Sequence, residues 1–360
     1  MLHAKMTSFL LAGALALLGC TGENVTSFDL QETDLPLGDR IGPVSQYGQL
    51  MAGSVNGIGG IYGSCKGVTA GAEVQVRGMS LYWSIMNAAN LYYTDAGISA
   101  MVKDMKIEIV RAAIATEENW GGPLSGFIKS PDEQRELIKQ TVEAAIKNDI
   151  YVIIDWHSHT ADKQEEKAIE FFSEMAQTYG MYNNVIFEIF NEPTQQSWET
   201  IKGYADKVVA AIREYSDNLI LVGNPNWDQV PSKAINNEVV DSLHNVAYTF
   251  HYYANTHSIT GQGNAAVRAM EAGLSVFVSE WGTGNADGKG TPNVQRNDDW
   301  QAWMDKYKLS SANWSASKIS EGTAAFTSEA TADSLVYSVS GELVKSYLAK
   351  NPDSYTKCKN

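Results

Sequence analysis

The segment NVIFEIFNEP, residues 184–193, predicts a buried β-strand that stops abruptly at an acid. The run 185–190 is mostly apolar and rich in β-branched and aromatic residues, which is typical of a buried strand. Pro193 ends the strand because it has no N–H group to donate to a neighbour. Parallel α/β folds carry their chemistry at such strand ends, so Glu192 is a candidate catalytic carboxylate.

Strand-like and helix-like segments alternate eight times, and the segment above supplies the fourth strand. The predicted strands are 74–79, 107–114, 151–155, 185–190, 219–222, 246–250, 274–278 and 311–313. The first strand lacks a G-x-G-x-x-G turn, which disfavours an open doubly wound sheet. Eight β–α units over roughly 300 residues predict an α/β fold, a (β/α)8 TIM barrel. Two short pieces at 49–51 and 58–62 predict a small hairpin before it.

The N-terminus predicts an exported lipoprotein. Residues 9–18 are apolar but too short to span a bilayer comfortably, which is typical of a signal peptide. The stretch Leu17-Leu18-Gly19-Cys20 resembles the bacterial lipobox, so we expect a signal peptide over 1–19 and a lipid on Cys20. An ordinary export leader that happens to contain a cysteine is the alternative. We expect an envelope lipoprotein, at the outer membrane or cell surface, or a secreted protein.

Composition narrows the class of ligand. Residues 20–44 are polar and predict a flexible tether, which leaves 45–360 for the barrel. A net charge of −15 lacks the basic footprint that nucleic acid requires. Nine Trp and seventeen Tyr provide flat faces that suit sugar rings, although many will pack in the core. We expect a neutral ligand and no nucleic acid, and nothing in the sequence favours an oligomer over the monomer we expect.

Two cysteines remain for a disulfide once Cys20 is assigned to a lipid. An even number of remaining cysteines in an exported protein, which meets an oxidising compartment, predicts a Cys65–Cys358 disulfide. Two free thiols are the alternative. In a barrel, the last helix returns the chain to the N-terminal face, where the predicted hairpin also lies. The two cysteines can therefore meet.

A second carboxylate ends the seventh predicted strand. Glu280 follows the apolar run 274–278 and lies across the mouth of a closed barrel from Glu192. Two facing carboxylates are what glycosidic bond cleavage needs, because one donates a proton while the other attacks the anomeric carbon or activates water. Either glutamate alone could be a surface charge or a structural ion pair, but two at matching strand ends favour chemistry.

Other strand ends supply supporting groups. Arg111 lies inside the second strand, where its buried charge needs an acidic partner. The other groups stand at strand ends: His157 at the third, His251 and Tyr253 at the sixth, and Trp314 at the eighth. The pair His157 and His159 raises the alternative of a zinc site. We expect no metal and no cofactor, since further ligands are lacking, and we interpret His159 as a loop residue without a catalytic role.

Seven motifs in order carry a family resemblance over about residues 45–350. They are VRGMS at 76–80, VRAA at 110–113, VIIDWH at 152–157, IFNEP at 189–193, FHYYA at 250–254, VSEWG at 278–282 and ANWS at 312–315. With them the chain resembles the retaining glycoside hydrolases of family 5, clan A, especially bacterial endo-β-1,4-glucanases (cellulases).

The resemblance implies a role for each matching residue. Glu192 would be the general acid/base and Glu280 the nucleophile, with their carboxyl groups about 5–5.5 Å apart. Arg111 and Tyr253 would hold Glu280. Asn191 would bind the sugar 2-hydroxyl, His157 and His251 would line the −1 subsite, and Trp314 would stack on sugar. We expect the pKa of Glu192 to be raised by the other carboxylate.

Two departures leave the substrate open. Leu81-Tyr82-Trp83 stands where many relatives have a histidine, and Ala115-Thr116 where some have a tyrosine. Trp83 then either stacks on sugar or packs in the core. We expect cellulose or a related β-glucan as substrate, with mannan or mixed-linkage glucan as the alternative on the same scaffold. A non-catalytic glycan-binding lipoprotein is a further alternative, against which the presence of both glutamates argues.

Overall fold

The chain folds into a closed eight-stranded parallel barrel, as the sequence predicts. A computed structural model describes residues 38–117 and 120–359. Within these residues the strands close in the order β10-β3-β4-β5-β6-β7-β8-β9. The strands are β3 (Arg77–Leu81), β4 (Ile109–Ala115), β5 (Tyr151–His157), β6 (Val185–Glu188), β7 (Ile220–Val222), β8 (Val246–Tyr253), β9 (Val276–Gly282) and β10 (Ser311–Ala316).

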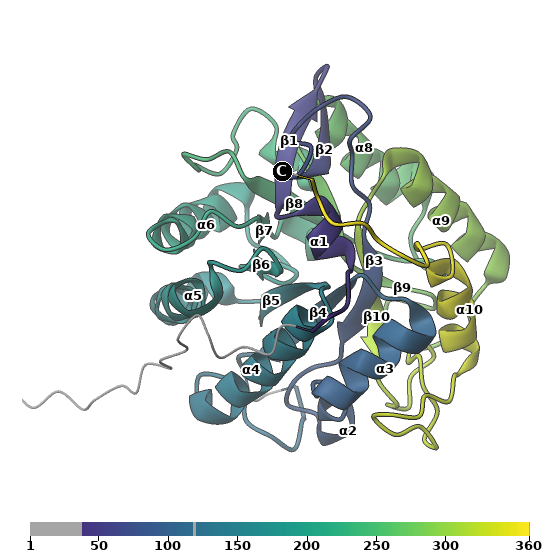
Figure 1. Cartoon of the computed structure of the whole chain (residues 1–360). Coiled ribbons are helices and arrows are strands. Elements are labelled where there is room, and N and C mark those ends of the chain that lie inside the picture. Colours follow the sequence, from purple (N-terminus) through teal and green to yellow (C-terminus); the bar gives the residue numbers. More distant parts are fainter. Residues whose placement is uncertain (1–37, 118–119, 360) are drawn as a thin grey trace, which may run out of the picture.

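Amphipathic helices surround the barrel (Figure 1). The longer ones are α3 (Asp95–Met105), α4 (Pro131–Lys147), α5 (Glu165–Tyr179), α6 (Trp198–Arg213), α8 (Asn264–Glu271), α9 (Val294–Tyr307) and α10 (Val339–Leu348). The shorter ones are α1 (Pro43–Tyr47), α2 (Asn87–Asn90), α7 (Pro225–Asp228), η1 (Ala161–Lys163), η2 (Pro231–Ala234) and η3 (Ile259–Gly263). Only short pieces, α7 and η2, join β7 to β8 in the described chain, so that connection is mostly loop.

Successive side chains along each strand point alternately into and out of the barrel, so the inward ones fill its interior in layers. On β5, Tyr151 and Ile153 pack in the inner apolar cluster, while Val152 and Ile154 pack outward beneath the helices. Asp155 and His157 continue the inward row toward the C-terminal end. The interior is therefore apolar at the base and polar at the mouth.

Some strand bounds differ from the sequence prediction. The first strand starts at Arg77 rather than residue 74, because the Val74 amide donates to the Ile61 carbonyl of the hairpin (2.8 Å) instead of to the barrel. In contrast, β5, β8 and β9 run further than predicted, since the end of β5 pairs with β4 and the ends of β8 and β9 pair with each other. The fourth strand ends at Glu188, so Glu192 lies in a loop beyond it.

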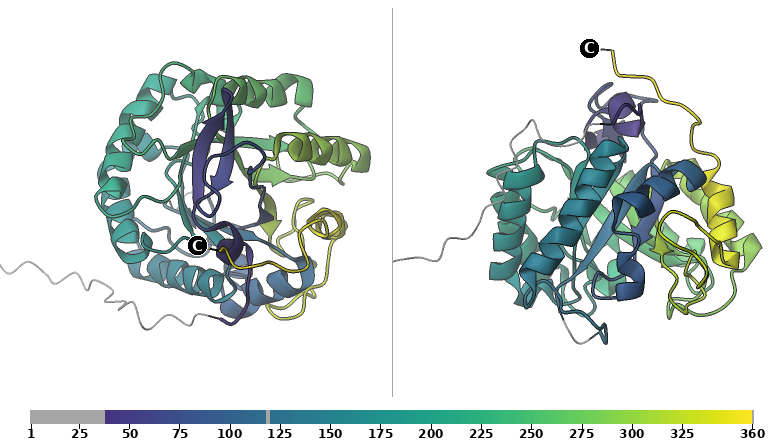
Figure 2. Two further views of the ribbon diagram at one scale, coloured as in Figure 1. Left: turned by 45° about the horizontal axis from the view of Figure 1, so that its top comes forward. Right: turned by 60° about the horizontal axis from the view of Figure 1, so that its bottom comes forward.

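The N-terminal hairpin β1 (Leu50–Val55) and β2 (Ile58–Gly63) covers the base of the barrel, as predicted. The predicted disulfide is present, with Cα atoms of Cys65 and Cys358 5.8 Å apart. Figures 1 and 2 show the C-terminal segment returning to this hairpin. The base is thus closed by both ends of the folded chain.

The predicted boundary between tether and barrel needs correction. Gly42 donates its backbone N–H to Asp149 (2.5 Å), and Val44 is buried. Residues 42–44 therefore pack on the barrel instead of belonging to a tether. The predicted signal peptide, Cys20 and the tether up to residue 37 lie outside the described residues. Among the described residues, no helix has the length and apolarity needed to cross a bilayer.

Candidate active site

A cleft of about 560 Å³ opens at the C-terminal end of the barrel. Most of the side chains named from the sequence line it, including Trp83, His157, Glu192, His251, Tyr253, Glu280 and Trp314. One oxygen of Glu192 lies within 4.8 Å of one oxygen of Glu280. This separation fits the close carboxylate pair of a retaining glycosidase, about 5–5.5 Å, rather than the wider inverting pair.

Glu280 is held as a carboxylate by two donors. Arg111 Nη1 donates to its Oε2 (2.9 Å) and the Tyr253 hydroxyl donates to its Oε1 (2.7 Å). Glu280 is only 4% exposed, and both contacts act with little water to screen them. The two contacts fix the orientation of the carboxylate oxygens at the cleft.

Arg111 is fully buried and binds three acids. Its Nε and Nη2 donate to the two oxygens of Glu188 (2.8 and 3.0 Å), and Nη2 also lies 2.9 Å from Asp155 Oδ2. Nη2 further donates to the amide oxygen of Asn191 (2.7 Å). A buried guanidinium needs this degree of pairing. It fixes Asn191 and Glu280 relative to each other.

His157 is a neutral ring at the mouth of β5. Burial, followed by the charge of Arg111, lowers its pKa to about 3. Its Nδ1 donates to Asp155 Oδ2 (2.6 Å), and its ring stacks on Trp314 at 5.6 Å between centroids. His157 and His159 therefore have different partners, and the two rings do not share a metal-ligand geometry.

Glu192 lies in a strained turn between two histidines. Its φ of 52° is left-handed, and its backbone N–H donates to Asp228 Oδ2 (2.9 Å). His251 Nδ1 lies 3.0 Å from its Oε1, and His159 Nε2 lies 3.4 Å from its Oε2. Burial raises the pKa of Glu192, but these two histidine contacts outweigh burial and lower it below the usual range.

One expectation about this acid is therefore wrong. The pKa of Glu192 is lowered rather than raised, because the hydrogen bonds and charges of the two histidines act on its oxygens. The contact between His159 and Glu192 was not predicted from the sequence.

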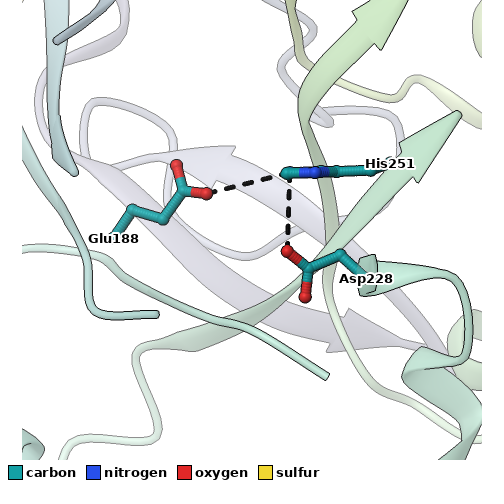
Figure 3. Close-up of side chains that lie close together, drawn as sticks. All are labelled: Glu188, Asp228 and His251. Atoms are coloured by element: carbon teal, nitrogen blue, oxygen red, sulfur yellow. Dashed lines mark ion pairs between the residues drawn. The ribbon is translucent and has the colours of Figure 1, made fainter. Parts of the chain in front are cut away.

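His251 is the positive centre of a buried charge cluster (Figure 3). Its Nε2 donates to Ser279 Oγ (2.9 Å) and lies 3.6 Å from Asp228 and 3.8 Å from Glu188. Burial lowers the pKa of His251, but Asp228 and then Glu192 raise it, to about 9 overall. The imidazolium is thus charged at neutral pH.

The same cluster has the donor types of a cation site, with ligand atoms of Glu188, Asp228 and His251 within 4.8 Å of one another. However, both oxygens of Glu188 accept from Arg111, and both oxygens of Asp228 accept backbone N–H groups of Asn224 and Glu192. Each of these oxygens therefore already has a hydrogen-bond donor. We interpret the cluster as a group of acids that surrounds the protonated His251.

Aromatic side chains form one wall of the cleft. The Trp83 ring lies 5.0 Å from those of Tyr82 and Trp120 and 6.4 Å from Trp314. Trp83 also lines the cleft, so it both packs against its neighbours and faces the ligand space. Packing of Trp83 is therefore observed, and its stacking on sugar stays a prediction.

Three residues of the site were not named from the sequence, namely Glu188, Asp228 and Ser279, and the contact of His159 with Glu192 was not predicted. Glu188 carried a signal, because a charge in the middle of an apolar strand needs a buried partner. Asp228 carried none, since an acid among Asn, Pro and Gly looks like an ordinary turn residue.

Comparison with known proteins agrees with this geometry. The family model described as cellulase (glycosyl hydrolase family 5) matches residues 68–320. The chain is 41% identical over 278 residues to endoglucanase Z of Dickeya dadantii, covering 76% of this chain and 62% of that protein. It is 36% identical over 267 residues to an endoglucanase of Clostridium saccharobutylicum, covering 72% and 56% of the two chains. The chain thus spans about three fifths of the length of these relatives.

Solved structures extend the similarity to the whole barrel. The catalytic domain of Thermobifida fusca endoglucanase Cel5A superposes with a TM-score of 0.74 at 30% identity, over 86% of this chain and 100% of that one. A variant of that domain has been solved in complex with cellotetraose. The matched motifs, the closed barrel and the carboxylate pair lead to one assignment: the chain belongs to glycosyl hydrolase family 5, the cellulase family.

Proposed function

We propose that the chain is a retaining endo-β-1,4-glucanase that hydrolyses internal bonds of cellulose or a related β-glucan by double displacement. The observation that carries this proposal is the pair Glu192 and Glu280, which share one cleft within 4.8 Å. Only a pair this close lets one carboxylate reach the anomeric carbon while the other reaches the leaving oxygen on the same bond.

In the first step, a carboxylate oxygen of Glu280 attacks the anomeric carbon and forms a glycosyl-enzyme. Arg111 and Tyr253 orient this carboxylate for the attack. Glu192 donates a proton to the glycosidic oxygen as the bond to the leaving sugar breaks. In the second step Glu192 removes a proton from water, which attacks the anomeric carbon and releases Glu280.

Three further residues position the sugar. The amide oxygen of Asn191 is committed to Arg111, so its NH₂ group is the part that donates to the 2-hydroxyl. Trp314 offers a ring face for stacking, and neutral His157, whose Nδ1–H is donated to Asp155, can accept through Nε2 without adding charge. The cellotetraose complex of the related Thermobifida domain supports a β-glucan as ligand.

Hydrolysis of a substrate panel tests the proposal. Carboxymethyl-cellulose should be cut with a rapid loss of viscosity, whereas mannan should be cut slowly or not at all. Proton NMR of the early product should show the β-anomer first, and an α-anomer first would refute retention. The variants Glu192→Gln and Glu280→Gln should each lose activity on the polymer by at least about 1000-fold.

The alternatives give different results in the same panel. A β-mannanase or a mixed-linkage glucanase would prefer the other polymer, and the endoglucanase names of the relatives favour neither. A glycan-binding lipoprotein would cut no polymer, and its Glu192→Gln variant would bind as tightly as the parent.

We also propose that Cys20 is lipidated and anchors the enzyme to a bacterial envelope, with 1–19 as the signal peptide. The lipobox-like stretch Leu17–Cys20 supports this part of the proposal. A chain expressed from its own leader should partition into the membrane fraction, and the Cys20→Ala variant should leave it. Equal membrane association of both proteins would refute the anchor.

A further inference from the structure

The proposed acid/base Glu192 has one histidine on each oxygen, and the two histidines differ in exposure. The His251 side chain is 2% exposed, whereas the His159 side chain is 37% exposed. His159 Nε2 lies 3.4 Å from Glu192 Oε2. Of these two contacts, the one to His159 is therefore the one that reaches solvent.

The loop that carries His159 is fixed on both sides. Ser158 Oγ and Gln164 Nε2 donate to Glu117 Oε1 (2.9 Å each), and Thr160 donates to the same oxygen. Gln196 Nε2 donates to the backbone carbonyl of His159 (2.9 Å).

The imidazole itself also has a packing partner, because the Trp120 ring lies 5.3 Å from it. A surface loop residue without a role has no need of such fixation. The approach of His159 to Glu192 is therefore built into the site.

We propose that His159 is the proton relay between solvent and Glu192, an inference that rests on the proposed retaining mechanism. Before the first step, the Nε2–H proton of the imidazolium moves to Glu192 Oε2. This leaves a neutral imidazole and a carboxylic acid, which donates that proton to the leaving oxygen. In the second step Glu192 takes a proton from the attacking water and returns it to His159, so protons balance over the cycle.

The surrounding charges favour a proton on this pair. Burial lowers the pKa of His159, but the hydrogen bond and charge of Glu192 raise it overall. The groups that face the pair or lie under its loop are Glu192, Glu280, Asp228, His157, His251, Glu117 and Asp162. Since the two histidines lower the pKa of Glu192, its carboxyl group is ionised at neutral pH while both contacts are present. A neighbouring imidazolium supplies the proton that it lacks.

The variant His159→Gln tests the relay, because glutamine keeps a polar side chain but does not titrate. On cello-oligosaccharides, the alkaline limb of kcat/KM should move at least about one pH unit lower, which is a tenfold loss at a fixed alkaline pH. On 2,4-dinitrophenyl β-cellobioside the first step needs no proton. There the variant should retain more than about half of the parental kcat/KM.

The matched control is His244→Asn, which removes a histidine at the opposite end of the barrel, near the hairpin. It should leave both pH profiles unchanged, and all proteins should have the same melting temperature within about 2 °C. If His159→Gln does not fold, His159→Asn replaces it.

A pH profile of the variant that superimposes on the parent overturns the relay. An equal loss on both substrates at every pH also overturns it, since that indicates a structural role. A parent that cuts neither substrate refutes the proposed function itself.

Discussion

At the residue scale, the Tyr253 hydroxyl is a donor whose effect can be isolated. It donates to Glu280 Oε1 at 2.7 Å, and the ring packs with Tyr82 and Trp314 independently of the hydroxyl. Tyr253→Phe should keep the fold but lower kcat/KM by about 10²–10³-fold, the effect of losing one preorganised donor. Steady-state kinetics on a soluble cello-oligosaccharide measures this. A loss below about threefold would mean that Arg111 alone orients the nucleophile.

Asp228 acts on Glu192 through the backbone. Its two oxygens accept the N–H groups of Asn224 (2.6 Å) and Glu192 (2.9 Å), so Asp228→Asn turns an amide NH₂ toward one of them. We expect a loss of about 1–3 kcal/mol in the free energy of unfolding and a 10- to 100-fold lower kcat, because the acid is misplaced.

The same variant should change the pH dependence of stability. The pKa of His251 is raised to about 9, against burial, by Asp228 first and then Glu192. A raised histidine contributes stability that is complete below its unfolded pKa of about 6.5 and is lost as pH rises through 9. Urea unfolding at pH 6 and at pH 9.5 should therefore show a larger gap between parent and Asp228→Asn at pH 6. A gap that does not change with pH would contradict the pairing.

Individual residues were predictable where a strand pattern exposed them. Glu192, Glu280 and Arg111 stand out because each interrupts or ends an apolar strand. His159 and Asp228 were not predictable, since their contacts depend on loop conformations that no sequence period encodes. The lowered pKa of Glu192 followed from these same loops, which explains why that expectation failed.

At the element scale, the hairpin under the barrel depends on a close backbone approach. A Cβ atom added at Gly59 would lie 2.0 Å from the Leu274 carbonyl oxygen, just before β9. Gly59→Ala should therefore push the hairpin away and destabilise the fold by about 1–3 kcal/mol, as other overpacking changes do. Because the hairpin is at the base, kcat should stay within about twofold of the parent, whose active site lies at the other end.

Gly203 provides the matched control. It lies within α6, and an added Cβ would have no neighbour within 4 Å. Gly203→Ala should stabilise by about 0.4–1 kcal/mol, since alanine loses less entropy in a helix. Thermal unfolding of both variants gives the comparison. Equal melting temperatures for the two would refute the tight hairpin contact.

Elements were more predictable than their ends. Seven of the eight strands start within two residues of the position that the sequence pattern predicts, and only the first starts later than that. The ends of β5, β8 and β9 were missed because His157, His251 and Glu280 look like loop residues. In the sheet they are paired with Asp155, Glu188 and Arg111, respectively.

At the scale of the whole molecule, chemistry and stabilisation lie at opposite ends of the barrel. The carboxylate pair occupies the C-terminal end, while the hairpin, α1 and the C-terminal segment close the base. The Cys65–Cys358 bridge joins residues 293 positions apart, so it restricts most of the unfolded chain.

The double variant Cys65→Ser, Cys358→Ser should therefore lose about 2–5 kcal/mol in the free energy of unfolding, with kcat unchanged within about twofold. Urea unfolding with and without a reductant measures this, and the parent under reductant should fall to the stability of the variant. The variant itself should not respond to reductant.

If the double variant were as stable as the oxidised parent, the other contacts of the C-terminal segment would be enough to hold it on the barrel, namely Tyr355 with Glu108 and the residue 358 amide with Ser45. If instead kcat fell with stability, the two ends of the barrel would be coupled, and the separation of chemistry from stabilisation would not hold for this chain.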